Sequence, residues 1–202
     1  MVHSISCSCG KLQGQIKDVN NINRCVCYCT DCQAFARYLN KQEEVLDKQG
    51  GTSIVQTIPE NIVFDQGIEN LACIRLSDRG LLRWYAACCH TPIGNTPTDA
   101  KFSFVGLVHS CLGSDRNLLD ETFGSITMYI HTADALGETK PKSRGAFLGT
   151  LRILGMILKA RLSGAYKNTP FFVSGSTSTP IATPKVLSEN ELAEAKTIKH
   201  EK

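Results

Sequence analysis

The chain has 202 residues, of which 42% are hydrophobic and 20% charged, so it can bury the core of one domain that carries an extension. Its formal net charge of +3 arises from 22 basic and 19 acidic residues spread along the sequence, which excludes a strongly basic nucleic-acid-binding protein. The opening MVHSISCSCG lacks the basic start and apolar stretch of a signal peptide, so we expect a cytoplasmic protein.

Ten cysteines are the most unusual feature of the composition. Disulfides seldom persist in a reducing cytoplasm, so this content favours metal binding or redox chemistry over a disulfide framework. Cys73 and Cys111 stand alone among apolar neighbours, and we interpret them as small buried hydrophobic residues. The other eight cysteines fall into three groups along the chain.

The first two groups are Cys7 and Cys9 in CSCG, and a cluster in NRCVCYCTDCQAF, residues 23–35. If the chain is extended up to Cys29, alternation points Cys27 and Cys29 to one side, and a turn then brings Cys32 to meet them. Three converging thiols are suitable ligands for a zinc ion with tetrahedral coordination. Alternation would also point Cys25 this way, but it lies about 6 to 7 Å further along the strand, so we expect it outside the zinc shell.

A helix is predicted from Thr30 or Asp31, as N-cap, to a stop at Gly50. Between Ser53 and Val108, turn residues separate five short β-like segments, which predict an antiparallel β core: SIVQT, NIVF, LACIRL, LLRWYA and FSFVGLV. The third cysteine group, Cys88 and Cys89, follows the fourth segment in WYAACCHTPIG.

The sequence SRGAFLGTLRILGMILKARLSG predicts a long helix with Phe147, Leu151, Leu154, Leu158 and Leu162 on one face, and with Arg152 and Lys159 on another side. We expect the leucine face to pack against protein, with a membrane surface as the alternative. The two cations interrupt an apolar run that is too short to span a bilayer. The Ser/Thr/Pro-rich and charged residues 174–202 predict a mobile tail.

The order of the motifs resembles the glutathione-dependent formaldehyde-activating enzyme family, also called the centromere protein V-like family. The motifs are Cys-x-Cys-Gly, then Cys-x-Cys-x-x-Cys in CYCTDC, then Cys-x-Thr-Pro in CHTP, and they cover roughly residues 5–108. The resemblance implies a mainly β fold, an antiparallel zinc-bearing β-tent (Mss4-like) core at residues 1–110. A helical C-terminal extension at 111–173 and the mobile tail would follow it.

The resemblance also implies two zinc sites. Cys27, Cys29 and Cys32 would hold the functional zinc, and Cys7 and Cys9 would supply half of a structural one. Cys89 takes the last ligand position, but Ala86 stands where its partner is expected. The structural site could therefore be three-coordinate in protein ligands, recruit Cys88 through a turn, or be absent. The family's usual Arg and Gly after the central motif are replaced by residues 33–36.

The function implied is that of a zinc-dependent carbon–sulfur lyase resembling S-(hydroxymethyl)glutathione synthase. It would carry one or two Zn²⁺, with Cys27, Cys29 and Cys32 as the catalytic ligands. A small thiol such as glutathione would enter an open zinc position and react with an aldehyde. The alternative is a zinc-stabilised, non-catalytic binding module in which Cys25 closes the site. Arg24, Arg37 and Arg83 flank the cysteine segments, and we interpret them as solvated charges.

Overall fold

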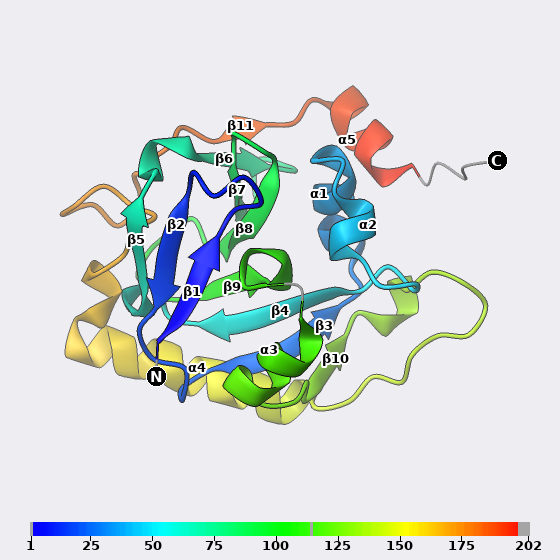
Figure 1. The fold of residues 1–202 in the computed structure, drawn as a ribbon, viewed down its shortest axis with the longest axis horizontal. Coiled ribbons are helices and arrows are strands. Elements are labelled where there is room, and N and C mark those ends of the chain that lie inside the picture. Colours follow the sequence, from blue (N-terminus) through cyan, green and yellow to red (C-terminus); the bar gives the residue numbers. More distant parts are fainter. Residues whose placement is uncertain (1, 114, 198–202) are drawn as a thin grey trace.

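The structure is a computed structural model that describes residues 2–113 and 115–197 (Figure 1). It is mainly β with a few helices, as the sequence predicts. The strands are β1 His3–Ser6, β2 Gln13–Ile16, β3 Asn23–Cys27, β4 Thr52–Thr57, β5 Ile62–Gln66, β6 Leu71–Arg75, β7 Leu82–Ala86, β8 Thr91–Thr96, β9 Val105–Val108, β10 Met128–Ile130 and β11 Lys185–Val186. The helices are α1 Thr30–Tyr38, α2 Gln42–Val45, α3 Arg116–Phe123, α4 Ala146–Ser163 and α5 Glu189–Lys196.

These strands form two sheets. A three-stranded sheet has the order β1-β2-β5, and an eight-stranded sheet has the order β10-β3-β4-β9-β8-β7-β6-β11. Neighbouring strands are antiparallel except at the two ends of the large sheet, where β10 runs parallel to β3 and β11 runs parallel to β6. Each of the five segments predicted between Ser53 and Val108 overlaps one of the observed strands.

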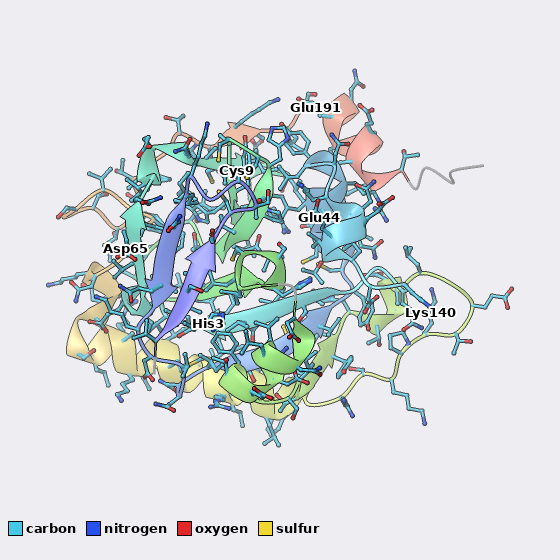
Figure 2. The ribbon with its side chains drawn as sticks, in the orientation of Figure 1. His3, Cys9, Glu44, Asp65, Lys140 and Glu191 are labelled. Carbon is cyan, nitrogen blue, oxygen red and sulfur yellow. The ribbon has the colours of Figure 1, made fainter. Side chains whose placement is uncertain are left out.

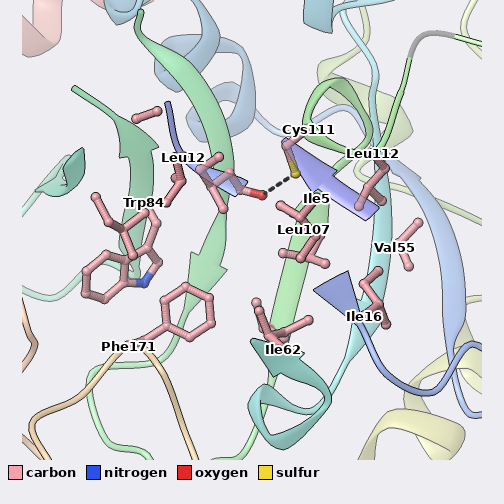
Figure 3. Close-up of a cluster of buried hydrophobic side chains, with 14 of the residues drawn as sticks. Ile5, Leu12, Ile16, Val55, Ile62, Trp84, Leu107, Cys111, Leu112 and Phe171 are labelled. Carbon is pink, nitrogen blue, oxygen red and sulfur yellow. Dashed lines mark hydrogen bonds between the residues drawn. The ribbon is translucent and has the colours of Figure 1, made fainter. Parts of the chain in front are cut away.

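The two sheets pack around a core that includes Trp84, Leu107 and Cys111 (Figure 3). Trp84 is fully buried, and its Nε1–H donates to Thr96 Oγ1 at 2.9 Å, so its polar edge is satisfied. Phe171, from the C-terminal part of the chain, lies against Trp84 with ring centroids 5.2 Å apart. The residues after the predicted zinc domain therefore contribute to the same core.

The C-terminal residues also complete the large sheet. β10 covers the outer edge of β3, with Met128 beside Cys25 and Ile130 beside Cys27, and β11 covers the edge of β6. Edge strands expose unpaired backbone groups, so both additions protect the core sheet. The predicted tail packs on α1 through α5, where Ala195 is buried and Ser188 forms a capping box with Glu191. Residues 198–202 of that tail lie outside the described residues.

The helix predicted to run to Gly50 is wrong in its length and its cap. The chain breaks it after Tyr38, because Asn40 adopts a left-handed conformation with φ of 54°, which asparagine tolerates better than most residues. The short helix α2 follows the break. The N-cap is Cys29 and not Thr30 or Asp31, and its sulfur accepts a hydrogen bond from the Cys32 N–H.

Helix α4 forms where it is predicted, but the predicted packing face is wrong. Gly149, Met156 and Ala160 are buried, with α4 lying against β10, β3 and β4. A Cβ on Gly149 would lie 2.5 Å from Met128 Sδ, so a larger residue there would have to displace the Met128 side chain. The large side chains of the opposite face are exposed, by the following fractions: Phe147 75%, Leu148 73%, Leu151 51%, Leu154 54%, Leu158 58% and Leu162 80%. No helix in the described ranges is both long and apolar enough to cross a membrane.

This orientation predicts that two apolar residues of α4 differ sharply in their contribution to stability. Met156→Ala should lower the free energy of unfolding by about 2 to 5 kcal/mol, because it leaves a cavity under the helix. Leu154→Ala should change it by no more than about 0.5 kcal/mol, because that side chain is mostly in water. Urea unfolding of both variants checks this, and a larger loss for Leu154→Ala would contradict the orientation.

Candidate metal centres

Two loops bring four cysteines together. Cys7 and Cys9 lie in the loop that joins β1 to β2, where Figure 2 labels Cys9, and Cys88 and Cys89 lie in the turn between β7 and β8. Their sulfur atoms all lie within 4.8 Å of one another. The Sγ atom of Cys88 is 3.8 Å from that of Cys7, 3.3 Å from that of Cys9 and 3.8 Å from that of Cys89. We call this set the four-cysteine cluster.

The turn after β7 explains how two adjacent cysteines reach one centre. In an extended chain Cys88 and Cys89 would point to opposite sides. Here the chain turns at once, because the N–H groups of Cys89 and His90 both donate to the Ala86 carbonyl, and His90 adopts φ of 58°. The structure thus matches the arrangement in which Cys88 is recruited through a turn. Ala86 itself is fully buried in the core.

Backbone and hydroxyl donors surround the sulfurs of this cluster. The Leu12 N–H donates to Cys7 Sγ at 3.3 Å, and Thr91 Oγ1 lies 3.1 Å from Cys89 Sγ. Burial raises the pKa of the Cys89 thiol, but hydrogen bonds from Ser8, Thr91 and nearby backbone groups outweigh burial and lower it to about 5. Burial, followed by the neighbouring sulfurs, raises the pKa of Cys88 to about 12.

The second group, which we call the three-cysteine cluster, consists of Cys27, Cys29 and Cys32. Cys27 ends β3, Cys29 caps α1 and Cys32 lies in the first turn of that helix, and their sulfurs lie within 4.8 Å of one another. Cys27 and Cys32 are buried, whereas Cys29 is only partly buried. The cluster therefore has its accessible side at Cys29, beside the positive end of the α1 dipole, which stabilises thiolates.

Arg83 is a cation that acts on this cluster. Hydrogen bonds from Cys27 and Cys29, and then the charge of Arg83, hold the pKa of Cys32 well below its ordinary value, against the effect of burial. Arg83 is only 3% exposed, and it donates to Asn95 Oδ1 at 3.2 Å and to Asp31 Oδ2 at 3.4 Å. The interpretation of Arg24 as a solvated charge is wrong, because it is buried and ion-paired with Asp120, and the same interpretation of Arg83 is also wrong. A charged residue inside the apolar strand LLRWYA is the signal that could have shown it.

Cys25 lies two residues before Cys27 on β3 and is fully buried. It packs in the same apolar group as Cys27 and Cys32, together with Ile54 and Met128, but its sulfur is outside the set that lies within 4.8 Å. Burial, followed by the charges of Cys32 and Cys29, raises the pKa of Cys25. Burial at this position therefore favours the protonated thiol over the thiolate.

The remaining predicted residues belong to neither cluster. Cys73 and Cys111 are buried in the main core, and burial raises the pKa of each to about 12, as expected of small hydrophobic residues. A cavity of about 600 Å³ lies between α1, α2 and α5, lined by residues that include Arg37, Tyr38 and Glu191. Its lining contains no member of either cluster.

Both clusters fit a tetrahedral metal that prefers sulfur. Zinc–sulfur bonds of about 2.3 Å require neighbouring sulfurs about 3.8 Å apart in a tetrahedron. The four-cysteine cluster has Sγ separations of 3.3 to 3.8 Å in its measured pairs, so little movement is needed to admit an ion. The three-cysteine cluster supplies three such ligands. The structure thus provides one complete and one incomplete set of thiolate ligands.

Comparison with known proteins places the chain in a family. Residues 1–182 match the family described as "Family of unknown function (DUF6151)". The chain belongs to this family. The matched residues include both cysteine clusters, α4 and the β-bridge between Phe172 and Pro180. The DUF6151 family therefore covers the β core together with the helical extension.

Two further comparisons add little. A crystal structure of a protein from Rhodobacter sphaeroides is 17% identical to this chain, with a TM-score of 0.38, and the alignment covers 61% of this chain and 96% of that one. So low a score does not establish a shared fold. No curated protein matches the chain.

The clusters predict how metal content responds to single substitutions. The purified protein should carry two metal ions, and Cys88→Ser and Cys29→Ser should each remove about one, because each removes a thiolate from a different cluster. Cys25→Ser and Cys73→Ala should retain both ions. Elemental analysis of protein prepared without added metal measures this, and metal-free wild-type protein would contradict it. A chelator should lower the melting temperature, because each bound ion would join separate elements of the fold.

Proposed function

We propose that this chain binds zinc at both clusters and that the three-cysteine cluster is a carbon–sulfur lyase-type centre for the adduct of a small thiol, such as glutathione, with an aldehyde. The observation that carries the proposal is the unequal pair of clusters, one with four converging sulfurs and one with three. Three protein thiolates leave one tetrahedral position free, which distinguishes a catalytic zinc from a structural one. On this proposal the core is a Mss4-like β-tent, as in the formaldehyde-activating enzymes that its motifs resemble.

Zinc is the metal we favour because all seven residues are cysteines. Zinc is commonly bound by Cys₄ sets at structural sites, and it needs no redox change to act on a thiol. Bound at the three-cysteine cluster, it would lower the pKa of an incoming thiol and hold that thiol beside the aldehyde. The four-cysteine cluster would have a structural role, joining the β1–β2 loop to the β7–β8 turn.

The residues around the three-cysteine cluster support this chemistry. Cys29 is the partly exposed ligand, so a small thiol would approach from its side, while Ile130 and Ile153 pack against the buried side. Three thiolates exceed the charge of a divalent ion by one. Arg83 and the N-terminus of α1 would offset that excess. The buried Arg83 would therefore be a positioning residue whose positive charge offsets the excess negative charge of the three thiolates.

The reaction needs no oxidant or reductant. The thiol sulfur attacks the aldehyde carbon, a carbon–sulfur bond forms, and the carbon–oxygen π bond breaks. The proton lost by the thiol ends on the former carbonyl oxygen, giving a hydroxyalkyl thioether. In the reverse direction the adduct releases the aldehyde and the thiol, which is the lyase direction.

A zinc-stabilised binding module without catalysis is the second candidate, and Cys25 is the observation that favours it. Its thiol shares the buried group that contains Cys27 and Cys32. If the end of β3 curled, Cys25 could supply a fourth sulfur and close the site. The raised pKa of Cys25 opposes this, because its thiolate is disfavoured in that buried position.

Cobalt substitution separates the two candidates. With Co²⁺ in both clusters, glutathione should change the visible absorption of the three-cysteine site in the wild type and in Cys25→Ser, because a fourth sulfur enters. S-methylglutathione has the same peptide but no thiol, so it should leave the spectrum unchanged. Cys29→Ser should lose the response.

The same samples test catalysis. By NMR exchange, the wild type should accelerate the interconversion of glutathione and formaldehyde with their adduct, and Arg83→Gln should reduce that acceleration more than Arg83→Lys, which keeps the charge. A site that already has four protein sulfurs and ignores added thiols would end the lyase proposal and leave the binding module.

A further inference from the structure

The outer face of α4 exposes large apolar side chains in a continuous row. Phe147, Leu151, Leu154, Leu158 and Leu162 are each at least half exposed. They recur every three or four residues over a helix of 18 residues, so they form one stripe that extends about 22 Å along the axis. Figure 1 shows α4 lying along one side of the molecule, with its length on the surface. An exposed apolar patch of this size marks an interaction surface.

The charge around this stripe is strongly positive, although the whole chain is nearly neutral. Residues 139–167 contain seven Lys and Arg and no Asp or Glu, and the rest of the chain has 15 basic and 19 acidic residues. At about 100° per residue, Arg152 and Lys159 lie on one flank of the stripe and Arg161 lies on the other. All three are exposed, and no ion pair within the described part of the chain involves them.

The loop that leads into α4 continues the basic region. Lys140 and Lys142 lie on this loop, where Figure 2 labels Lys140, and Arg144 stacks on the Tyr129 ring with its Cζ 4.5 Å from the ring centroid. The ring contact therefore holds the positive charge of Arg144 two residues before the start of the helix. The charge of the loop has the same sign as that of both flanks.

We propose that α4 is an interfacial helix that docks this protein on an anionic lipid membrane. The leucine stripe would enter the boundary between headgroups and acyl chains, and the flanking cations would meet lipid phosphates at the level of the headgroups. The helix already packs on the sheet through its small residues, so docking requires no rearrangement of the fold. The proposal does not depend on the chemistry of the cysteine clusters.

Two features favour a membrane over other occupants. A second copy of the chain would bring two strongly basic segments together in a symmetric contact, which like-charge repulsion opposes. The stripe is convex, with cations on both flanks, and this arrangement suits a flat anionic surface that accepts all of them at once.

Vesicle sedimentation of the full-length, metal-loaded protein tests the proposal. The protein should sediment with phosphatidylcholine vesicles that contain phosphatidylserine and remain in solution with phosphatidylcholine alone. Raising the salt from about 0.1 M to about 1 M should weaken binding, because the cations are screened. Leu151→Glu combined with Leu158→Glu should reduce binding more than about tenfold.

The matched control is Leu118→Glu combined with Phe102→Glu, which makes the same changes at exposed apolar residues outside α4 and should bind like the wild type. Arg152→Gln combined with Lys159→Gln should weaken binding by about fivefold per charge while leaving the apolar stripe intact. Wild-type protein that ignores anionic vesicles, or a Leu151/Leu158 variant that binds as well as the wild type, would overturn the proposal. The proposal would also be overturned if the wild-type protein formed a dimer, the Leu151/Leu158 variant were monomeric, and neither protein bound vesicles.

Discussion

The crowding of reduced sulfurs is the constraint on which the rest of this structure depends. Seven thiols meet in two groups, and within each group the sulfur atoms lie within 4.8 Å of one another. The four-cysteine cluster joins the β1–β2 loop of the small sheet to the β7–β8 turn of the large one. The three-cysteine cluster joins the end of β3 to the start of α1. A metal ion bound in each group would cross-link these elements, and its binding energy would then be folding energy.

The C-terminal half of the chain is built around this core and does not stand apart from it. β10 and β11 pair with the two outer strands of the large sheet, and Phe171 reaches the central tryptophan. α4 lies over the sheet face that contains Cys25, so it helps to keep that side of the three-cysteine cluster dry. The match to the DUF6151 family through residue 182 agrees with this arrangement. Core and extension form one unit, in which α4 packs on the sheet with its leucine stripe facing outward.

Much of the β core could be predicted, because turn residues separate its strands. The three-cysteine cluster could be predicted because its members are close in sequence, so the local path of the chain brings them together. The sequence does not predict strand β8, since Pro92 and Gly94 in TPIGNT indicate a turn. Gly94 is needed there because a Cβ would lie 2.7 Å from the Gly106 carbonyl oxygen of the neighbouring strand. The buried face of α4 was also misjudged. Hydrophobicity favours the leucines, but the close packing of α4 on β10 selects Gly149 and Ala160, a tertiary constraint that periodicity does not contain.

The proposed function depends on the two clusters having different numbers of sulfur ligands. Zinc-edge X-ray absorption of the purified protein tests this difference most directly. One complete and one incomplete thiolate set predict an average of about 3.5 sulfur ligands per zinc at about 2.3 Å, with a light atom completing the second site. After glutathione is added, the average should rise toward about four sulfurs, because the thiol replaces the light atom. Four sulfurs per zinc before any thiol is added would contradict the account.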